Sequence, residues 1–293
     1  MAEWQDVSEN PVEGDRAAAR PWARDQADGL RRMFGHRAPK VVAFASGREA
    51  CGRTTLIVQT ASALASAGYG VLIVDENQAP NNVISAYGFR PRYDFYQVLQ
   101  GKCLLEESLL RVAPHIRILP ASLAAQELGY AQRDAAVACQ KLPRVLQELQ
   151  RGVDFILIDA AVQHSTHLSM LALASRHMAV IVGAESSAIT RAYALIKRLA
   201  QERGRDGFQM VITRPRSPAD ALAIFENMRR VAKEHLDVRL EYLGAAVDVT
   251  TDHLADALLK QIPSSVGLAQ EDGFMDLPAA YAPSGTTSTP ALA

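Results

Sequence analysis

Residues 46–55 fit the frame of a phosphate-binding loop, and this stretch constrains the fold more than any other part of the chain. It reads SGREACGRTT, which matches G-x-x-x-x-G-K-[ST] at every fixed position except the lysine, which is Arg53. An apolar run over 41–45 precedes it and a helix-like run over 54–67 follows it. A strand, a glycine-containing turn and a helix in this order place backbone N–H groups around a phosphate at a helix N-terminus. The sequence therefore predicts an α/β fold with such a loop after its first strand.

Short β-rich runs alternate with helix-like runs along the rest of the chain. The expected strands are 41–45, 71–75, 116–119, 155–159, 178–182, 208–213 and 240–243, and the expected helices are 54–67, 133–151, 166–175, 188–203 and 219–235. This alternation is typical of a mostly parallel, twisted sheet with helices on both faces. Residues 155–158 are apolar throughout, which indicates a strand buried on both sides.

Composition changes divide the chain into three regions. Residues 1–35 are polar and charged and contain Pro11 and Pro21, so we expect a flexible N-terminal arm that ends in a short helix over 25–34. Residues 36–263 form the expected P-loop domain. Residues 264–293 are rich in Ser, Thr, Pro, Gly and Ala, a composition typical of a disordered tail.

Overall charge and cysteine content exclude several classes of protein. The chain has 31 basic and 32 acidic residues, so bulk electrostatics give no reason to expect a nucleic acid partner. Its three cysteines lack a paired spacing, which argues against a disulfide framework or a zinc site and for a reducing compartment. A charged N-terminus and the lack of a long apolar run predict a cytoplasmic protein.

The loop itself supplies the nucleotide-binding candidates. Gly47 and Gly52 let the backbone approach a phosphate, and Thr54 and Thr55 open a helix whose dipole favours an anion. The Thr54 hydroxyl is also the group expected to reach Mg²⁺. Arg53 keeps the charge of the missing lysine, but its planar, branched head does not fit where a compact ammonium lies. The loop predicts phosphate binding with altered chemistry.

Two further strand ends carry acidic candidates. The run 71–75 ends in Asp75 and is followed two residues later by Asn77, while 155–159 ends in Asp159 at a Walker B position. Either Asp alone is more simply explained as a helix cap or turn residue. The three elements in this order favour a nucleotide site, with Asp75, Asn77 and Asp159 as catalytic candidates and with Thr54 and Asp159 as candidates for holding Mg²⁺.

The order and spacing of these elements resemble the MinD/ParA group of deviant Walker P-loop ATPases. Within that group, three stretches resemble the FlhG (FleN) family, regulators of flagellar number and placement. They are DQADGLR at 25–31, the segment 82–88 with VLQG at 98–101, and ESSAITRAYALIK at 185–197, which is similar to the family's P-E-P-T-S-x-T-D-A-Y-A-L-I-K. The resemblance extends from about residue 25 to residue 263.

The resemblance implies that the arm forms a short helix that docks on the GTPase FlhF and stimulates its hydrolysis. The residues that match the arm motif and are implied to activate the partner are Asp25, Gln26, Leu30 and Arg31, with Gln26 as the active element. An amide at this position is able to orient a water near the partner's phosphate. From periodicity alone, an amphipathic helix folded onto its own domain is the better explanation of the arm. The exact heptapeptide in front of a P-loop domain favours docking on the partner instead.

Several residues depart from the family pattern at the nucleotide site. The resemblance implies bound ATP and Mg²⁺, a lysine that crosses an ATP-bound dimer at Arg48, and another lysine at Arg53. An acid that assists water attack aligns with Asn77, and an asparagine on the base side of the nucleotide aligns with Thr213. Glu49 and Ala50 replace loop glycines. We therefore expect weak nucleotide binding and weak or absent hydrolysis.

Three functions remain open at this point. The first is a regulator that acts through its arm on an FlhF-type GTPase and contacts a flagellar transcriptional activator or basal-body component. The second is a MinD-like switch that forms homodimers when it binds ATP. The third is a ParA-type partition ATPase. The family also implies a C-terminal amphipathic helix attached to the inner membrane. Here that helix, 252–262, carries one lysine, and packing into the core explains it better.

Overall fold

The computed structural model describes residues 38–48, 50–128, 133–160, 168–246 and 252–261, together with Phe274. These lie in the unit from Arg37 to Ala293. The arm over 1–35, with its expected helix, and the tail over 264–293, apart from Phe274, lie outside the described residues, and their predicted boundaries stay predictions.

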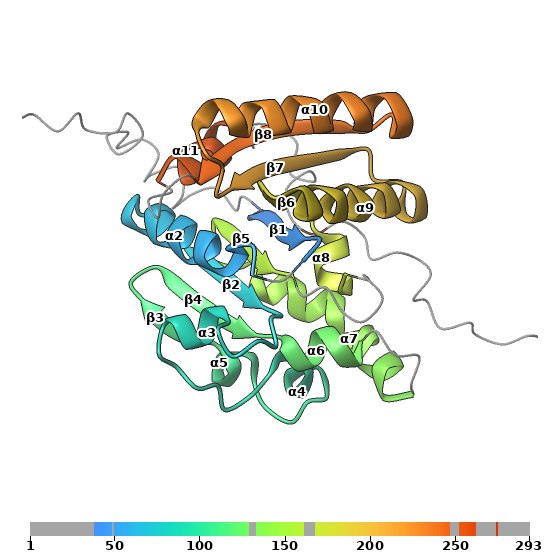
Figure 1. Ribbon diagram of the computed structural model, residues 1–293. Coiled ribbons are helices and arrows are strands. Elements are labelled where there is room, and N and C mark those ends of the chain that lie inside the picture. Colours follow the sequence, from blue (N-terminus) through green and yellow to red (C-terminus); the bar gives the residue numbers. More distant parts are fainter. Residues whose placement is uncertain are drawn as a thin grey trace, which may run out of the picture. The chain divides into compact units, whose positions relative to one another are not determined.

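An eight-stranded sheet forms the centre of the described fold, in the order β3-β4-β2-β5-β1-β6-β7-β8 (Figure 1). The strands are β1 (Lys40–Ser46), β2 (Val71–Asp75), β3 (Leu110–Ala113), β4 (Ile116–Pro120), β5 (Phe155–Asp159), β6 (His177–Gly183), β7 (Gly207–Thr213) and β8 (Arg239–Ala246). All neighbours are parallel except β3 and β4. The predicted mostly parallel α/β sheet is confirmed, and each of the seven expected strands is present.

The strand β3 was not predicted. It is four residues long, lies at the sheet edge, and runs antiparallel to β4 after a tight turn in which His115 has a φ of 65°. The two residues that connect β3 and β4 are Pro114 and His115. This pair is not one of the Asn-Gly or Asp-Gly pairs that signal a hairpin in a sequence. An edge hairpin of this length carries too little periodicity to be read from sequence.

The helices cover both faces of the sheet. They are α2 (Arg53–Ser66), α3 (Val83–Ala86), α4 (Phe95–Leu99), α5 (Leu105–Ser108), α6 (Ser122–Glu127), α7 (Arg133–Leu149), α8 (Met170–Ala174), α9 (Ser186–Arg203), α10 (Pro218–Leu236) and α11 (Asp252–Gln261). The five expected long helices are confirmed, with one correction. The helix expected over 166–175 begins only at Met170, because Ser169 caps it by accepting a hydrogen bond from the Ala172 N–H at 3.0 Å.

Alternate residues of β1 face two separate halves of the core. Val41 and Ala43 pack in the cluster formed with α4 and with α6 to α10, whereas Val42 and Phe44 pack in the cluster formed with α2, α3 and α11. This period of two, with both sides apolar, is what a central strand of a parallel sheet requires. Leu254 and Leu258 of α11 are buried in the second cluster, which confirms the expected packing of that helix into the core.

The parallel register brings the candidate residues to one edge of the sheet. Asp75 at the end of β2 lies opposite Asp159 at the end of β5, and Phe44 of β1 also lies opposite Asp159. The phosphate loop begins just beyond, so it lies at the carboxyl ends of β1, β2 and β5, where open α/β sheets bind ligands. None of the described helices has the length and apolar character that a membrane span requires.

Candidate functional site

The loop backbone has the turn that a phosphate-binding loop needs. Gly52 precedes α2 with a φ of 85°, and Arg53 begins the helix. A Cβ on Gly47 would lie 2.4 Å from the backbone carbon of Arg191 in α9, so only glycine fits there. Thr55 is exposed in the first turn of α2. Ala50 has a φ of 56°, which is a left-handed conformation that glycine adopts without strain.

The Arg53 side chain contacts Asp159 and Ser46 rather than projecting into solvent. Its Nε donates to Asp159 Oδ1, and its Nη1 donates to Ser46 Oγ at 3.0 Å. The Arg53 side chain is 11% exposed, and that of Asp159 is fully buried. The guanidinium therefore neutralises the Walker B carboxylate from within the chain.

The remaining groups around Asp159 complete a small network. Thr54 Oγ1 donates to Asp159 Oδ2 at 2.8 Å, and Asn77 Nδ2 donates to Thr54 Oγ1 at 3.2 Å. The structure therefore brings Arg53, Thr54, Asn77 and Asp159 together, as the sequence predicted for this edge. Each has a hydrogen-bond partner within the group.

Asp75 lies next to this network, at the end of the neighbouring strand β2. Its carboxylate accepts the N–H of Asn77 at 3.1 Å and that of Ile84 at 2.9 Å. Burial, followed by repulsion from Asp159, raises the pKa of Asp75 to about 7, although the two N–H donors and Arg53 act in the opposite direction. Burial therefore favours the protonated form of this carboxyl group.

The Mg²⁺ that the resemblance implies does not fit beside Arg53. Mg²⁺ takes a near-octahedral shell of oxygens and depends on carboxylate charge. Here one Asp159 oxygen accepts from the guanidinium and the other from Thr54. Among the described residues, no group of three or more His, Cys, Asp and Glu side chains is placed to hold a metal ion. The donor set that Mg²⁺ would use is already satisfied.

Two other residues predicted to bind nucleotide, Arg48 and Thr213, connect the loop to the neighbouring part of the sheet. Arg48 forms an ion pair with Glu185, at the start of α9, at 2.7 Å. Thr213, expected on the base side of a nucleotide, donates its hydroxyl to the Cys51 carbonyl at 3.0 Å. Both contacts tie the loop to the ends of β6 and β7.

Ser46 and Glu185 complete the site, and sequence reasoning assigned neither of them a role. Ser46 Oγ donates to the Arg48 carbonyl at 2.7 Å and accepts from Arg53. The available signal was their position: Ser46 directly follows the expected strand 41–45, and Glu185 lies three residues after the expected strand 178–182, and both strands finish at the same sheet edge. Asp25, Gln26, Leu30 and Arg31 of the arm lie outside the described residues.

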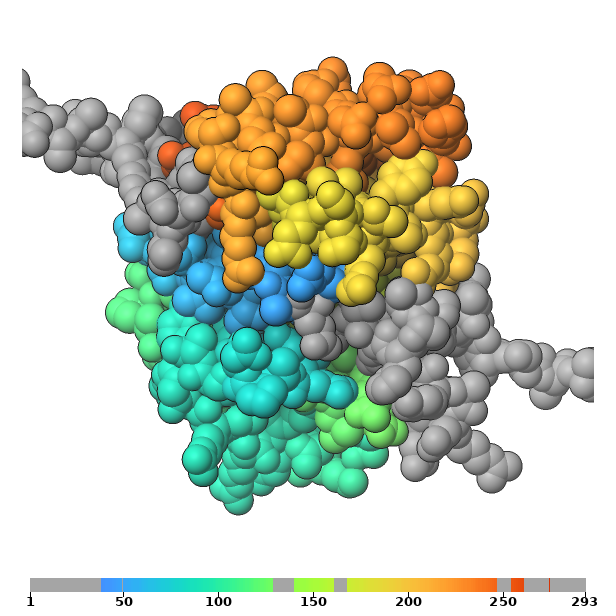
Figure 2. Space-filling model, viewed as in Figure 1, coloured from blue at the N-terminus to red at the C-terminus, as the bar shows by residue number. Residues whose placement is uncertain are grey.

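The hollows in the described part of the molecule include one at the loop and one at the edge of the sheet. One, of about 390 Å³, lies beside the loop and is lined by residues that include Arg48, Cys51, Glu185, Thr213, Arg214 and Arg216. In the space-filling view, the loop and α2 form the blue surface in the middle (Figure 2). The cyan and green surface of the residues that follow in sequence lies on one side of it, and the yellow and orange surface of α9 and α10 lies on the other. The site therefore opens where these parts of the chain meet.

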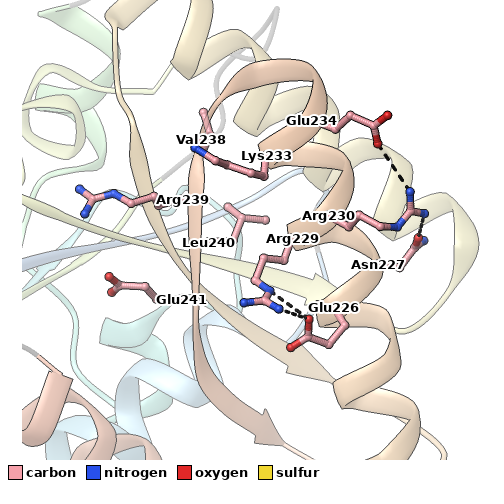
Figure 3. A pocket seen from close by; sticks show the side chains of 10 residues that line it. All are labelled: Glu226, Asn227, Arg229, Arg230, Lys233, Glu234, Val238, Arg239, Leu240 and Glu241. Atoms are coloured by element: carbon pink, nitrogen blue, oxygen red, sulfur yellow. Dashed lines mark hydrogen bonds and ion pairs between the residues drawn. The ribbon is translucent and has the colours of Figure 1, made fainter.

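The second hollow, of about 900 Å³, lies between α10 and the edge strand β8 (Figure 3). Its charged side chains pair with one another: Arg229 with Glu226 at 2.6 Å and Arg230 with Glu234 at 3.6 Å. Exposed pairs of this kind contribute little to stability. Its other two basic side chains, Lys233 and Arg239, pair with Asp237 and Asp206, so each of the four cations in the groove has a carboxylate partner.

The backbone of Ala50 gives a direct test of the loop conformation. A non-glycine residue in the left-handed region costs about 1–2 kcal/mol, and glycine loses about 0.5–1 kcal/mol through chain entropy. We expect Ala50→Gly to raise the free energy of unfolding in urea by roughly 0.5–1 kcal/mol. The matched control, Ala65→Gly within α2, should lower it by about 1 kcal/mol. Equal destabilisation by both changes would contradict the loop conformation.

The raised pKa of Asp75 predicts a pH dependence of stability. Because the folded-state pKa of about 7 lies above the ordinary 3.8, the folded protein holds the proton more tightly. This contribution is fully present below pH 3.8 and is lost as the pH rises through 7, by on the order of 4 kcal/mol. Asp75→Asn should flatten the fall in unfolding free energy between about pH 4 and 7, relative to wild type. Asp206→Asn, at an exposed carboxylate, should leave the slope unchanged, and an unchanged slope in Asp75→Asn would contradict the burial argument.

The sequence is similar to that of known proteins. The family model described as AAA domain matches residues 39–205. The chain is 27% identical over 205 residues to "Antiactivator FleN" of Pseudomonas aeruginosa, covering 70% of this chain and 72% of the relative. It is 23% identical over 209 residues to "Flagellum site-determining protein YlxH" of Helicobacter pylori, covering 70% of this chain and 69% of the relative.

Solved structures of other proteins have the same fold as this chain. The septum site-determining protein MinD of Pyrococcus horikoshii, complexed with Mg-ADP, superposes with a TM-score of 0.54 at 21% identity, over 78% of this chain and all of that chain. A putative plasmid partition protein of Borrelia burgdorferi, bound to AMPPNP, superposes with a TM-score of 0.56 at 18% identity, over 77% of this chain and all of that chain. Because the family model spans more than half of the chain, the protein belongs to this AAA domain family, as an FlhG/FleN-like member of its MinD/ParA group.

Proposed function

We propose that the protein regulates flagellar number and placement through contacts with partners rather than through ATP turnover. One relative carries the name antiactivator and another the name flagellum site-determining protein. The sequence resemblance to regulators of flagellar number and placement points in the same direction. Cell division and plasmid partition proteins have the same fold, so the fold does not distinguish between these functions. The proposal therefore depends on the sequence relatives and on the site.

The ion pair between Arg53 and Asp159 is the observation that carries the proposal on catalysis. Hydrolysis in P-loop ATPases requires a lysine on the phosphates and a Walker B carboxylate at the metal. In this chain the lysine is replaced, and its replacement binds the carboxylate that the metal needs. The position of the water-assisting acid is Asn77, whose amide donates to Thr54. A site of this composition binds nucleotide weakly and hydrolyses it little.

The activity of the proposed regulator resides in its arm. The motif DQADGLR at 25–31 precedes the domain, and we assign it the stimulation of an FlhF-type GTPase. The Gln26 amide orients a water toward the partner's phosphate, as glutamines do in other GTPase sites. Leu30 supplies an apolar contact on the docking side of the arm helix.

The domain is proposed to present this arm and to contact a flagellar transcriptional activator or basal-body component. Homodimer formation is included because the MinD/ParA fold supports it. The apolar residues Leu254 and Leu258 of α11 are buried against the core, so we do not assign membrane attachment to this helix. The balance of 31 basic and 32 acidic residues gives the partition function on DNA no electrostatic support.

One observation favours an ATP-driven switch as a second candidate. Gly47, Gly52 and Thr54 retain the backbone turn and the hydroxyl of a working loop. If Arg53 leaves Asp159 when a nucleotide enters, phosphate binding is restored in part. Such a switch requires Mg²⁺-dependent turnover that disappears in Asp159→Ala.

Substitution of Gln26 tests the proposed function. Gln26→Ala removes the amide that orients water, so stimulation of GTP hydrolysis by a purified FlhF-type GTPase should fall by about tenfold or more. Gln5→Ala, in the same arm but outside the motif, is the matched control and should stimulate fully. Both variants should unfold at the temperature of the wild type. Full stimulation by Gln26→Ala would exclude the arm as the active element.

A further inference from the structure

We infer that the Arg53 guanidinium takes the place of the divalent cation in this pocket, so that the folded site is charge-balanced without metal. This inference rests on the proposed function only in treating the loop as degenerate. Its content is different: it assigns Arg53 the role of a resident cation, and it predicts that removing the guanidinium exposes a cation site on Asp159.

The contacts of Arg53 are those of a bound cation. Nε donates to Asp159 Oδ1, and Nη1 donates to Ser46 Oγ at 3.0 Å. Thr54 Oγ1, the hydroxyl expected to reach Mg²⁺, donates to the second Asp159 oxygen at 2.8 Å. The positive charge therefore lies among the same oxygens that a P-loop uses for its metal.

The surroundings explain why a cation is needed here. Asp159 is fully buried, and Asp75, 1% exposed, lies opposite it in the register of β2 and β5. Two adjacent buried carboxylates are stable only when a positive charge or a proton offsets them. Arg53 offsets Asp159, whereas Asp75 accepts the backbone N–H groups of Asn77 and Ile84.

A covalently attached cation also has an advantage over a dissolved one. Arg53 is the first residue of α2, and Ser46 ends β1, so the guanidinium is held next to Asp159 by the fold. Tethering of this kind gives a high effective concentration that free Mg²⁺ has to exceed. Once the guanidinium is gone, the Asp159 carboxylate and the Ser46 and Thr54 hydroxyls supply the hard oxygen ligands that Mg²⁺ and Mn²⁺ prefer.

The experiment compares thermal unfolding of wild type and Arg53→Ala, without nucleotide, in EDTA and in millimolar Mg²⁺. We expect the wild-type unfolding temperature to be the same in both. Arg53→Ala should unfold on the order of 10 °C lower in EDTA, since a buried carboxylate is left uncompensated, and Mg²⁺ should restore at least half of the loss. Arg48→Ala, which removes an exposed arginine from the same loop, should show no response to metal.

Binding of Mn²⁺, followed by electron paramagnetic resonance, gives a second readout. Arg53→Ala should bind Mn²⁺ at least tenfold more tightly than wild type, and Arg53→Ala combined with Asp159→Asn should lose that gain. Equal Mn²⁺ binding by wild type and Arg53→Ala would overturn the inference, and so would an Arg53→Ala protein whose stability does not respond to metal. If Arg53→Ala does not fold in EDTA, recovery of folded protein in Mg²⁺ supports the inference and failure to recover overturns it.

These outcomes are separate from those of the proposed function, because neither nucleotide nor GTPase is present. A metal response in Arg53→Ala together with full GTPase stimulation by Gln26→Ala would overturn only the regulatory proposal. If Gln26→Ala loses stimulation of the GTPase as expected and Arg53→Ala shows no response to metal, only the inferred role of Arg53 would be overturned.

Discussion

The burial of Asp159 beside Asp75 is the constraint around which this site is organised. Parallel pairing of β2, β5 and β1 fixes the two carboxylates at one sheet edge, out of water. An uncompensated charge in that position would cost several kcal/mol. Arg53 at the start of α2 supplies the compensation for Asp159. The hydrogen bond that Thr54 donates to Asp159 and the one that Ser46 accepts from Arg53 hold the pair in place.

The same pair accounts for a phosphate loop that keeps its fold while, as proposed, it turns over little ATP. The turn at Gly52 and the close approach of Gly47 to α9 are structural requirements that are independent of a bound nucleotide. The change from lysine to arginine keeps the charge but provides a planar donor that reaches the carboxylate. With the role inferred for Arg53, the loop remains folded while its cation position is filled from within the chain.

Much of this arrangement follows from the sequence because it depends on ordered, strongly patterned elements. The apolar runs that became β1, β2 and β5 and the residues at their ends are local signals, and parallel pairing makes their convergence predictable. The Arg53 contact with Asp159 was not predictable, because it depends on the rotamer of one side chain across 106 positions of sequence. The same is true of Ser46 and Glu185, whose roles arise from packing. The edge strand β3 and the short helices α3 to α6 carry too little periodicity to be read locally.

The most direct test of the account is calorimetric titration of the purified protein with ATP and Mg²⁺, read alongside its oligomeric state. If Arg53 takes the place of the metal as inferred, we predict only weak binding, detectable at millimolar nucleotide at most, and no nucleotide-driven dimer. Micromolar binding that converts the protein to dimers would contradict the account, since it would show that Arg53 leaves Asp159 readily and that the loop still works as an ATP-dependent switch.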